Sequence, residues 1–495
     1  METWKLFDHF RARENRTDCR PRGIALLILL LGLSEFIAPV ARANVWGRLA
    51  NRGFEGQRIK AAYFFAGPAL DGTQPYECSC APNLDKYTLH PDPEDIHEKW
   101  RPEDRATVMT MMADAGINVI TMSYWGEAFL PCSDGWCSGA APMQDSAKAQ
   151  DELFDAAAQK SLLIEPYIEG RFNLWFMRDE FPVWDDGTVS PGLVSQVVFL
   201  IRRYLQDPSK PEWARTWARV YDRFGVPRYA VGLIQVASAH LDVDDQEAFA
   251  QGFDRVAAAV AAATGGVQVG FFIDAIPANA DDGQPPHANF KPSPRGTGPA
   301  LLKTQSLLGI QCFASEIWGA VGDLRKDDNH ILAWKRGFLR GWISAGIPTL
   351  VDVSPGYDGH LVFGNDSHAS YGFSAEWFAG MTSIVNDLAR AGIIYNSWNG
   401  YTEKMAGTRT RERGTMLYDW LTSLNAHREL FVDRTASGPQ SGTASEPFRA
   451  ITDANTVSSN GDFIYIRTGS YPEEITFSNQ LTLVARDGPA TIGSP

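Results

Sequence analysis

Short apolar runs alternate with amphipathic segments along most of the chain. Each apolar run is almost continuous, which is typical of parallel β-strands covered on both faces. Eight such runs occur, at Lys60–Ala66, Asn118–Ser123, Leu162–Ile168, Tyr229–Ala237, Val267–Ile276, Ile310–Ile317, Pro348–Val353 and Gly392–Trp398. The pattern therefore predicts eight buried strands.

The segments between these runs have apolar residues at helical spacing. They lie at Arg105–Ala115, Gln150–Lys160, Leu193–Leu205, Gln246–Ala263, Thr304–Leu308, Asn329–Ser344, Ala375–Ala391 and Gly414–Ala426. Strands alternating with helices in this way predict an α/β fold, a (β/α)8 TIM barrel over residues 44–434. An open doubly wound sheet is the alternative, but no GxGxxG or P-loop sequence follows the first strand.

The N-terminal residues have the composition of an export signal. Arginines up to Arg22 precede an apolar run over 24–33, and an Ala-Arg-Ala sequence ends at Ala43. We expect a signal peptide at 1–43, with an uncleaved anchor as the alternative. The protein would then be secreted or periplasmic, or associated with the cell surface, with no stable membrane insertion after cleavage.

The cysteines agree with export. Cys132 and Cys137 bracket a turn-forming Ser-Asp-Gly-Trp stretch and predict a disulfide, whereas Cys312 within an apolar run predicts a buried thiol. Either Cys78 or Cys80 could bridge to that loop or bind a metal. No second CxxC motif or paired histidine lies near them, so we predict no metal and no cofactor.

The formal net charge of −14 disfavours nucleic acid and anionic membrane surfaces as partners. It is compatible with a neutral or cationic substrate.

Carboxylates and aromatic side chains gather at the predicted carboxyl ends of the strands, where TIM barrels build their active sites. Aromatic faces stack on sugar rings, while carboxylates bind hydroxyl groups and exchange protons. Asp274 and Glu316 end apolar runs, where an unpaired carboxylate is expensive, and we therefore predict both to be catalytic. Glu165, within its strand, could equally be a structural acid. The predicted substrate-binding residues are Tyr124, Trp125, Glu169, Trp318, Asp352, Tyr357, Asp358, Trp398, Asn399 and Tyr401.

Two stretches after the last strands carry a family resemblance. SPGYDGH at Ser354–His360 and YNSWNGYTE at Tyr395–Glu403 resemble barrel glycoside hydrolases of the endo-α-mannosidase-like and α-1,3-glucanase-like group. In that group the last strand ends in a stretch with two active-site acids. The resemblance implies that Glu403, which matches the second acid, is the general acid/base.

The position of the first acid holds Gly400 instead. In the mannosidase-like enzymes that acid assists the 2-hydroxyl of the substrate, so the resemblance does not carry this route over to the present chain. Glu403 would need another partner, with Glu316 and Asp274 as candidates. Loss of catalysis with retention of a sugar-binding cleft is the alternative.

The composition changes after the last predicted helix. Residues 435–446 are rich in Ser, Gly and Thr and predict a linker. Beyond it, 447–495 resembles the start of a right-handed parallel β-helix of the pectin-lyase-like kind, with a short helix (PFRAITDANTV) followed by DFIYIRTGSYPEEITF and QLTLVARDGPATI.

The sequence thus predicts a secreted glycoside hydrolase that cleaves a polysaccharide or glycan by carboxylate acid/base catalysis. The alternative is a non-catalytic carbohydrate-binding or cell-surface protein on a hydrolase scaffold. A lyase centred on the β-helix is disfavoured, because few coils of that helix are present.

Overall fold

A computed structural model provides the coordinates. It describes residues 45–65, 88–92, 104–124, 146–168, 193–233, 246–275, 295, 297–316, 327–358, 370–401, 404–443, 446–459, 461–479 and 481–493. The predicted signal peptide and the predicted Cys132–Cys137 disulfide lie outside these residues. No helix among them is long and apolar enough to cross a bilayer.

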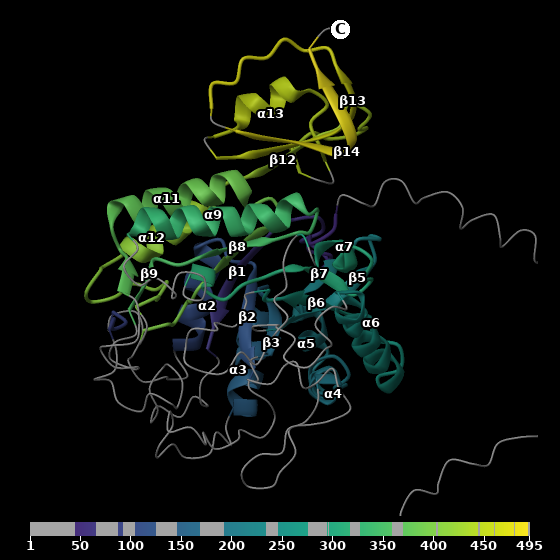
Figure 1. The fold of residues 1–495 in the computed structure, drawn as a ribbon, viewed down its shortest axis with the longest axis vertical. Helices are drawn as coiled ribbons and strands as arrows, with labels where there is room; N and C mark the ends of the chain where they lie inside the picture. Colours follow the sequence, from purple (N-terminus) through teal and green to yellow (C-terminus); the bar gives the residue numbers. More distant parts are fainter. Residues whose placement is uncertain are drawn as a thin grey trace, which may run out of the picture. The chain divides into compact units, whose positions relative to one another are not determined.

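Eight parallel strands form a barrel (Figure 1). They are β1 (Ile59–Phe64), β2 (Val119–Tyr124), β3 (Leu163–Ile168), β5 (Pro227–Leu233), β6 (Val269–Ile273), β7 (Leu307–Ile310), β8 (Leu350–Val353) and β11 (Gly392–Tyr395). Their order of hydrogen bonding is β7-β6-β5-β3-β2-β1-β11-β8, and an isolated parallel bridge between Ile310 and Thr349 joins the two ends. The predicted (β/α)8 barrel is confirmed.

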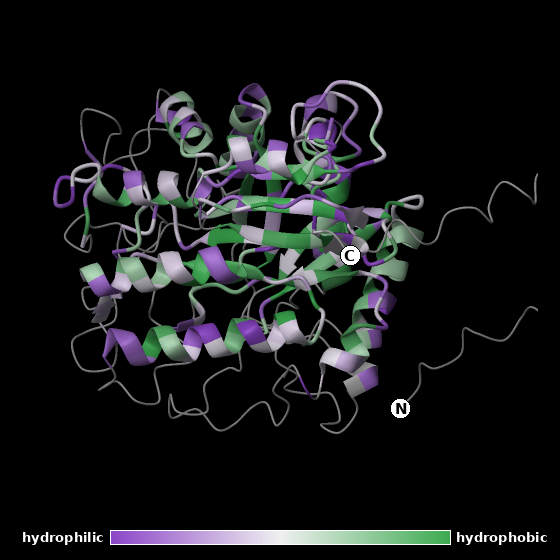
Figure 2. Cartoon of the chain, turned by 90° about the horizontal axis from the view of Figure 1, so that it is seen from above, coloured by the Kyte–Doolittle hydropathy of each residue, from purple (hydrophilic) through white to green (hydrophobic). Residues whose placement is uncertain are grey.

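The helices follow the strands in the chain. They are α2 (Asp104–Asp114), α3 (Ser146–Gln159), α4 (Leu193–Tyr204), α5 (Pro211–Thr216), α6 (Gln246–Ala263), α7 (Gly298–Leu301), α9 (Asp328–Ser344), α11 (Ala375–Leu388) and α12 (Met416–Asn425). Figure 2 shows mainly hydrophobic strands in the middle and hydrophilic positions along the helices around them. Three short strands accompany the barrel: β4 (Arg219–Tyr221) pairs antiparallel with β5, and β9 (Gly356–Asp358) pairs with β10 (Ser370–Gly372).

One predicted helix is wrong. Thr304–Leu308 is not helical, because Asp254 of α6 accepts hydrogen bonds from the backbone N–H groups of Gln305 and Ser306 and β7 begins at Leu307. The predicted strand Ile310–Ile317 is therefore wrong except for its first residue, since β7 covers Leu307–Ile310.

Two apolar clusters lie on opposite faces of the strands. One fills the barrel interior and includes Tyr63, Leu163, Phe272 and Ile394. The other packs the outer faces of the strands against the helices and is much larger. Alternate residues along each strand contribute to the two clusters, as the pleat of a strand requires.

Gly392 begins β11, beside Ile59 of β1. Its φ is +148°, and a Cβ atom there would lie 1.9 Å from the carbonyl oxygen of Ile59. Only a glycine therefore allows these two strands to approach each other.

The segment 45–58 lies at the amino ends of the strands. Leu49 pairs with Val220 of β4 and belongs to the interior cluster, and the Trp46 indole donates to the carbonyl of Leu307 (3.0 Å). Arg58 reaches Glu429 (Nε to Oε1, 3.2 Å), which also pairs with Arg48.

A second, three-stranded parallel sheet follows α12. It consists of β12 (Glu429–Val432), β13 (Phe463–Tyr471) and β14 (Thr482–Ile492), and α13 (Ile451–Val457) packs against it. β12 falls within the range predicted for the barrel but pairs with β13. The described part of 435–446 contains no helix or strand. These strands form one sheet, so the parallel β-helix itself stays a prediction.

Candidate active site

Several predicted site residues lie outside the described residues. They are the predicted acid/base Glu403 and the predicted substrate-binding residues Trp125, Glu169 and Trp318. The site is therefore built here from the strand ends that the structure describes.

Asp274 directly follows β6 at the carboxyl end of the barrel and is fully buried. Its Oδ2 atom accepts hydrogen bonds from the Tyr167 hydroxyl (3.3 Å) and from the backbone N–H of Phe313 (3.4 Å). Both distances are long for hydrogen bonds of these donors. The carboxylate is thus held in place by donors from β3 and from the turn after β7.

Aromatic rings surround this carboxylate. Tyr63 contacts Tyr167 edge-on (5.6 Å between centroids) and Phe313 at a tilted angle (4.6 Å). Burial, together with the negative charge of Asp274, raises the pKa of Tyr167 well above its usual value. Tyr167 therefore stays protonated and acts as a hydrogen-bond donor at any physiological pH.

Glu316 lies in the turn after β7 rather than at the end of a strand. Its two carboxylate oxygens are both engaged, by the Ser354 hydroxyl and by the ammonium of Lys335 from α9. The same ammonium binds Asp352 of β8 (Nζ to Oδ2, 2.8 Å), and all three charged side chains have no exposed surface. The structure thus brings two predicted site carboxylates together around one lysine.

Lys335 keeps Glu316 ionised, whereas burial and the Glu316 charge raise the pKa of Asp352 in spite of Lys335. Burial alone would raise the pKa of Glu316, but the charge and hydrogen bonds of Lys335 outweigh it and hold that pKa below its usual value. Burial would likewise lower the pKa of Lys335, but Asp352 and Glu316 raise it. Both partners therefore stay charged at neutral pH.

Lys335 was not predicted as a site residue, although its position on the apolar face of α9 indicates a buried charge. Lys335 occupies an apolar-face position of α9, four residues before Leu339 and on the same side as Leu332, and it is as fully buried as Leu339. A lysine on the buried face of a helix requires a buried anion, so its spacing could have indicated the ion pair.

Glu165 of β3 lies inside the barrel. The Thr121 hydroxyl donates to its Oε2 (3.1 Å), and Gln311 donates to Thr121 (3.3 Å). Burial raises the pKa of Glu165 to about 8, against hydrogen bonds from Gln311 and Thr121 that lower it. Glu165 is therefore a neutral acid at pH 7 and fits the structural alternative better than an ionised catalytic group.

This shift predicts a pH-dependent stability. The folded state keeps the Glu165 proton up to about pH 8 whereas the unfolded state loses it near its ordinary pKa of 4.5, so stability declines between these values. We expect Glu165→Gln, which copies the neutral acid, to remove this decline of up to about 1.4 kcal/mol per pH unit. Denaturant unfolding at several pH values between 5 and 8 would measure it.

The control for this experiment is Glu376→Gln, at an exposed position of α11. It should leave the wild-type dependence on pH unchanged. Parallel curves for the wild type and Glu165→Gln would show that Glu165 ionises normally.

The described aromatic residues of the predicted site are buried. Tyr357 stacks near Tyr371 (6.0 Å), and Tyr124, Trp398 and Tyr401 have no exposed surface. Each belongs to the large cluster between strands and helices. The structure therefore places these rings in the core packing.

The predicted residues Asn399 and Asp358 lie in segments that are connected by hydrogen bonds and an ion pair. Asn399 uses both ends of its amide on the backbone of Phe65, accepting from its N–H (2.9 Å) and donating to its carbonyl (3.0 Å). Asp358 pairs with Lys404 (3.5 Å), and the Tyr401 carbonyl accepts from the backbone N–H of Leu89 (3.1 Å). The segments after β1, β8 and β11 are thus held together by these contacts.

Gly400 is closely covered. A Cβ atom there would lie 2.3 Å from the Ser397 hydroxyl oxygen and 3.2 Å from the Cβ of Met405. An acidic side chain at this position would have to displace Ser397.

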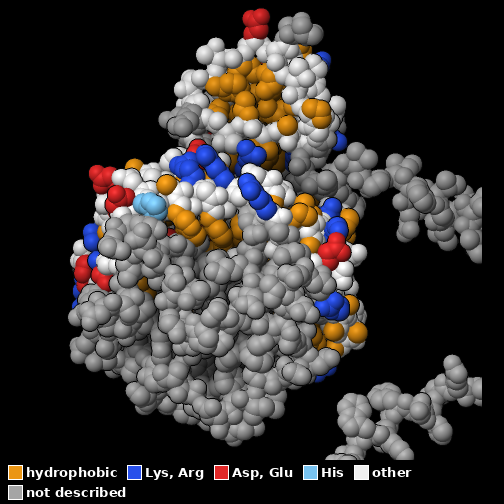
Figure 3. Space-filling model, in the orientation of Figure 1, with side chains coloured by type: hydrophobic (Ala, Val, Ile, Leu, Met, Phe, Trp, Pro, Cys, Tyr) orange, Lys and Arg blue, Asp and Glu red, His pale blue; other side chains and the backbone are white. Residues whose placement is uncertain are grey.

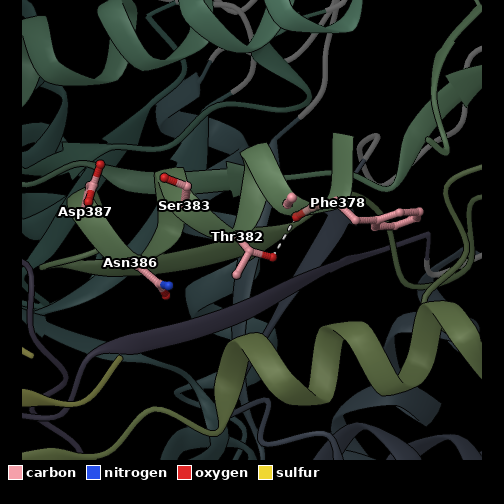
Figure 4. Close-up of a pocket in the computed structure, with 6 residues that line it drawn as sticks. Phe378, Thr382, Ser383, Asn386 and Asp387 are labelled. Atoms are coloured by element: carbon pink, nitrogen blue, oxygen red, sulfur yellow. Dashed lines mark hydrogen bonds between the residues drawn. The ribbon is translucent and has the colours of Figure 1, made fainter. Parts of the chain in front are cut away.

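A pocket of about 480 Å³ lies along α11 (Figure 4), lined by Phe378, Ala379, Thr382, Ser383, Asn386 and Asp387. Its one carboxylate, Asp387, is paired with Arg336 of α9, close to Arg340 (3.8 Å). Figure 3 shows Lys and Arg side chains gathered over α9 and α11. The pocket is a surface feature of a helix and not part of the strand ends.

Two further findings concern cofactors and cysteines. Within the described residues, no group of three or more His, Cys, Asp or Glu side chains could hold a metal ion. Cys312 is a buried free thiol, as predicted.

No protein-family model and no curated protein sequence matches the chain. Among solved structures it is similar to the GH99 endo-α-mannosidase from Bacteroides thetaiotaomicron, at 12% identity and a TM-score of 0.42, covering 74% of this chain and 95% of that one. It is also similar to a glycoside hydrolase-like protein (11%, TM-score 0.46, covering 74% and 92%). A third is the catalytic domain of the major endoglucanase from Xanthomonas campestris pv. campestris (13%, TM-score 0.41, covering 77% and 99%). The fold assignment rests on strand order and register, and no residue role is taken from these proteins.

Proposed function

We propose that this protein is a secreted glycoside hydrolase that cleaves glycosidic bonds of a polysaccharide or glycan. The observation that carries the proposal is the carboxylate of Asp274, buried at the carboxyl end of the barrel and held by Tyr167. A carboxylate fixed at this end of a TIM barrel can act on a bound sugar, because active sites of this fold form there.

Glycoside hydrolysis requires two carboxyl groups on either side of the scissile bond. We assign Asp274 as the nucleophile or the base and Glu403 as the general acid/base, which protonates the leaving oxygen. Glu316 is the weaker candidate for the first role, because Lys335 and Ser354 already occupy both of its oxygens. It is better placed to support the site than to attack a substrate.

Export is part of the same proposal. The signal sequence at 1–43 and the Cys132–Cys137 loop support a protein that works outside the cytoplasm. The three parallel strands of the C-terminal sheet also support a parallel β-helix that starts at β12.

A screen of the purified protein against a panel of polysaccharides and glycans would test the function. We expect release of new reducing ends from at least one neutral polymer. Release from none, with no binding to any member of the panel, would contradict both the hydrolase and any carbohydrate-related function.

One observation favours a second candidate, a carbohydrate-binding protein without catalysis. Gly400 stands at the position of the first acid in the resembling enzymes, and the Ser397 hydroxyl occupies the space where a side chain would begin. This candidate predicts that panel members bind and that no reducing ends appear at any pH.

A further inference from the structure

The two ends of the strand order, β7 and β8, meet at a seam in the barrel wall. Where β7 ends and β8 begins, the backbone closes the seam, since the Ile310 N–H donates to the Pro348 carbonyl (2.8 Å) and Ile310 pairs with Thr349. Beyond Ile310 no further β7–β8 backbone pairing occurs among the described residues. Past this point the two sides of the seam are connected through side chains.

Lys335 fills this part of the seam. Its ammonium lies between Asp352 of β8 (2.8 Å) and Glu316 of the turn after β7, with no exposed surface on any of the three side chains. A buried cation shared by two carboxylates fixes both of them strongly, because removing it leaves buried charges without a partner.

Asp352 also binds the turn after β7, residues 312–316. Its carboxylate accepts from the backbone N–H of Ser315 (2.6 Å) and from the Ser315 hydroxyl (3.2 Å). Just before it, Ala314 has a φ of +44°, a left-handed conformation that a residue with a side chain adopts at a cost. The turn therefore depends on these bonds to keep its shape.

The same turn contacts the candidate catalytic carboxylate. The backbone N–H of Phe313 donates to Asp274 (3.4 Å), and the Cys312 carbonyl accepts from the side-chain amide of Asn396 after β11 (3.3 Å). A continuous set of contacts thus runs from Lys335 through Asp352 and the turn to Asp274.

We propose that Lys335 is a positioning residue, which fixes the turn 312–316 and through it the carboxylate of Asp274. The proposal rests on the assigned function of Asp274. It goes beyond that function, because it assigns the buried ion pairs of Lys335 a role in catalysis in addition to their role in stability.

The test compares Lys335→Met with Arg228→Met. Arg228 forms another buried ion pair, with Asp222 (Nε to Oδ2, 2.7 Å), next to the start of β5 at the opposite end of the barrel. Both variants lose a buried cation, so a purely structural effect should be similar in the two.

We expect Lys335→Met to lower kcat by about 10²-fold with little change in KM, the effect of a small displacement at a reacting group. Arg228→Met should keep the wild-type kcat when both are assayed at a temperature at which they are folded. Equal kcat values in the two variants would overturn the proposal.

Hydrogen exchange followed by mass spectrometry gives a readout that does not need activity. In Lys335→Met the amides of 311–316 should exchange at least about tenfold faster, while those of β5 keep their protection. Unchanged exchange at 311–316 would overturn the positioning role even in a protein that hydrolyses glycans. Faster exchange in a protein without hydrolase activity would reject the proposed function alone.

A second variant tests the proposal in case Lys335→Met does not fold. Lys335→Met combined with Glu316→Gln removes one carboxylate with the cation and so keeps the net charge of the cluster. It should show the same faster exchange at 311–316 and the same low kcat; recovery of the wild-type kcat in it would contradict the role of Lys335.

Discussion

Replacing Asp274 by Asn is expected to lower kcat for glycan hydrolysis by about 10³-fold, within the range of 10²–10⁴ that a positioned acid or base contributes. The amide has nearly the same shape and can still accept from the Tyr167 hydroxyl and the Phe313 N–H. It cannot ionise, attack a sugar carbon or take a proton from water. The measurement is the steady-state rate on the glycan identified in the panel.

The matched control is Asp387→Asn on α11, where the lost charge lies on the protein surface and pairs with Arg336. It should retain the wild-type kcat and KM. Binding of the glycan by Asp274→Asn should also persist, which separates loss of chemistry from loss of the cleft. Full activity of Asp274→Asn would remove Asp274 from the mechanism.

Replacing Gly392 by Ala is expected to destabilise the protein by more than about 4 kcal/mol, at the exceptional end of single substitutions. The new Cβ atom would lie 1.9 Å from the Ile59 carbonyl oxygen, and the φ of +148° is itself unfavourable for alanine. Relief requires separation of β1 and β11, which pair over Ile59–Ala62. The midpoint of denaturant unfolding, or the soluble yield if the variant does not fold, would measure the loss.

Gly337→Ala in α9 is the control for this substitution. A Cβ atom at Gly337 meets no atom within 4 Å, and alanine is favoured over glycine in a helix interior by about 0.5–1 kcal/mol. It should therefore be neutral or stabilising. A Gly392→Ala variant as stable as Gly337→Ala would show that the two strands can separate at little cost.

The barrel could be predicted because its physical cause is visible in the sequence. Parallel strands buried on both faces must be apolar throughout, and seven of the eight strands lie largely within such runs, whereas β7 shares only Ile310 with its predicted run. Prediction failed at Thr304–Leu308, where backbone N–H groups donate to the distant carboxylate of Asp254 and so set the backbone. The short strand β4 was also missed, because its three residues are too few to show a pattern and one of its partners, Leu49, is distant in the sequence.

The site could be predicted only in part. Asp274 could be predicted because a carboxylate at the end of an apolar run is costly to bury and is therefore retained for a partner or a function. The link between Glu316 and Asp352 could not be predicted, because both pair with Lys335. This lysine lies 19 residues from Glu316 and 17 residues from Asp352 in the sequence. A search confined to acids and aromatic residues does not find the lysine that holds them.

The ion pair between Arg48 and Glu429 joins residues separated by 381 positions. The segment 45–58 therefore has partners in β4 and β12, which the ribosome makes much later. Contacts of such long range slow folding, because most of the chain must be ordered before they form. We expect the segment 45–58 to lack its ion pairs until synthesis has passed Glu429, so the amino end of the barrel should become fixed late in folding.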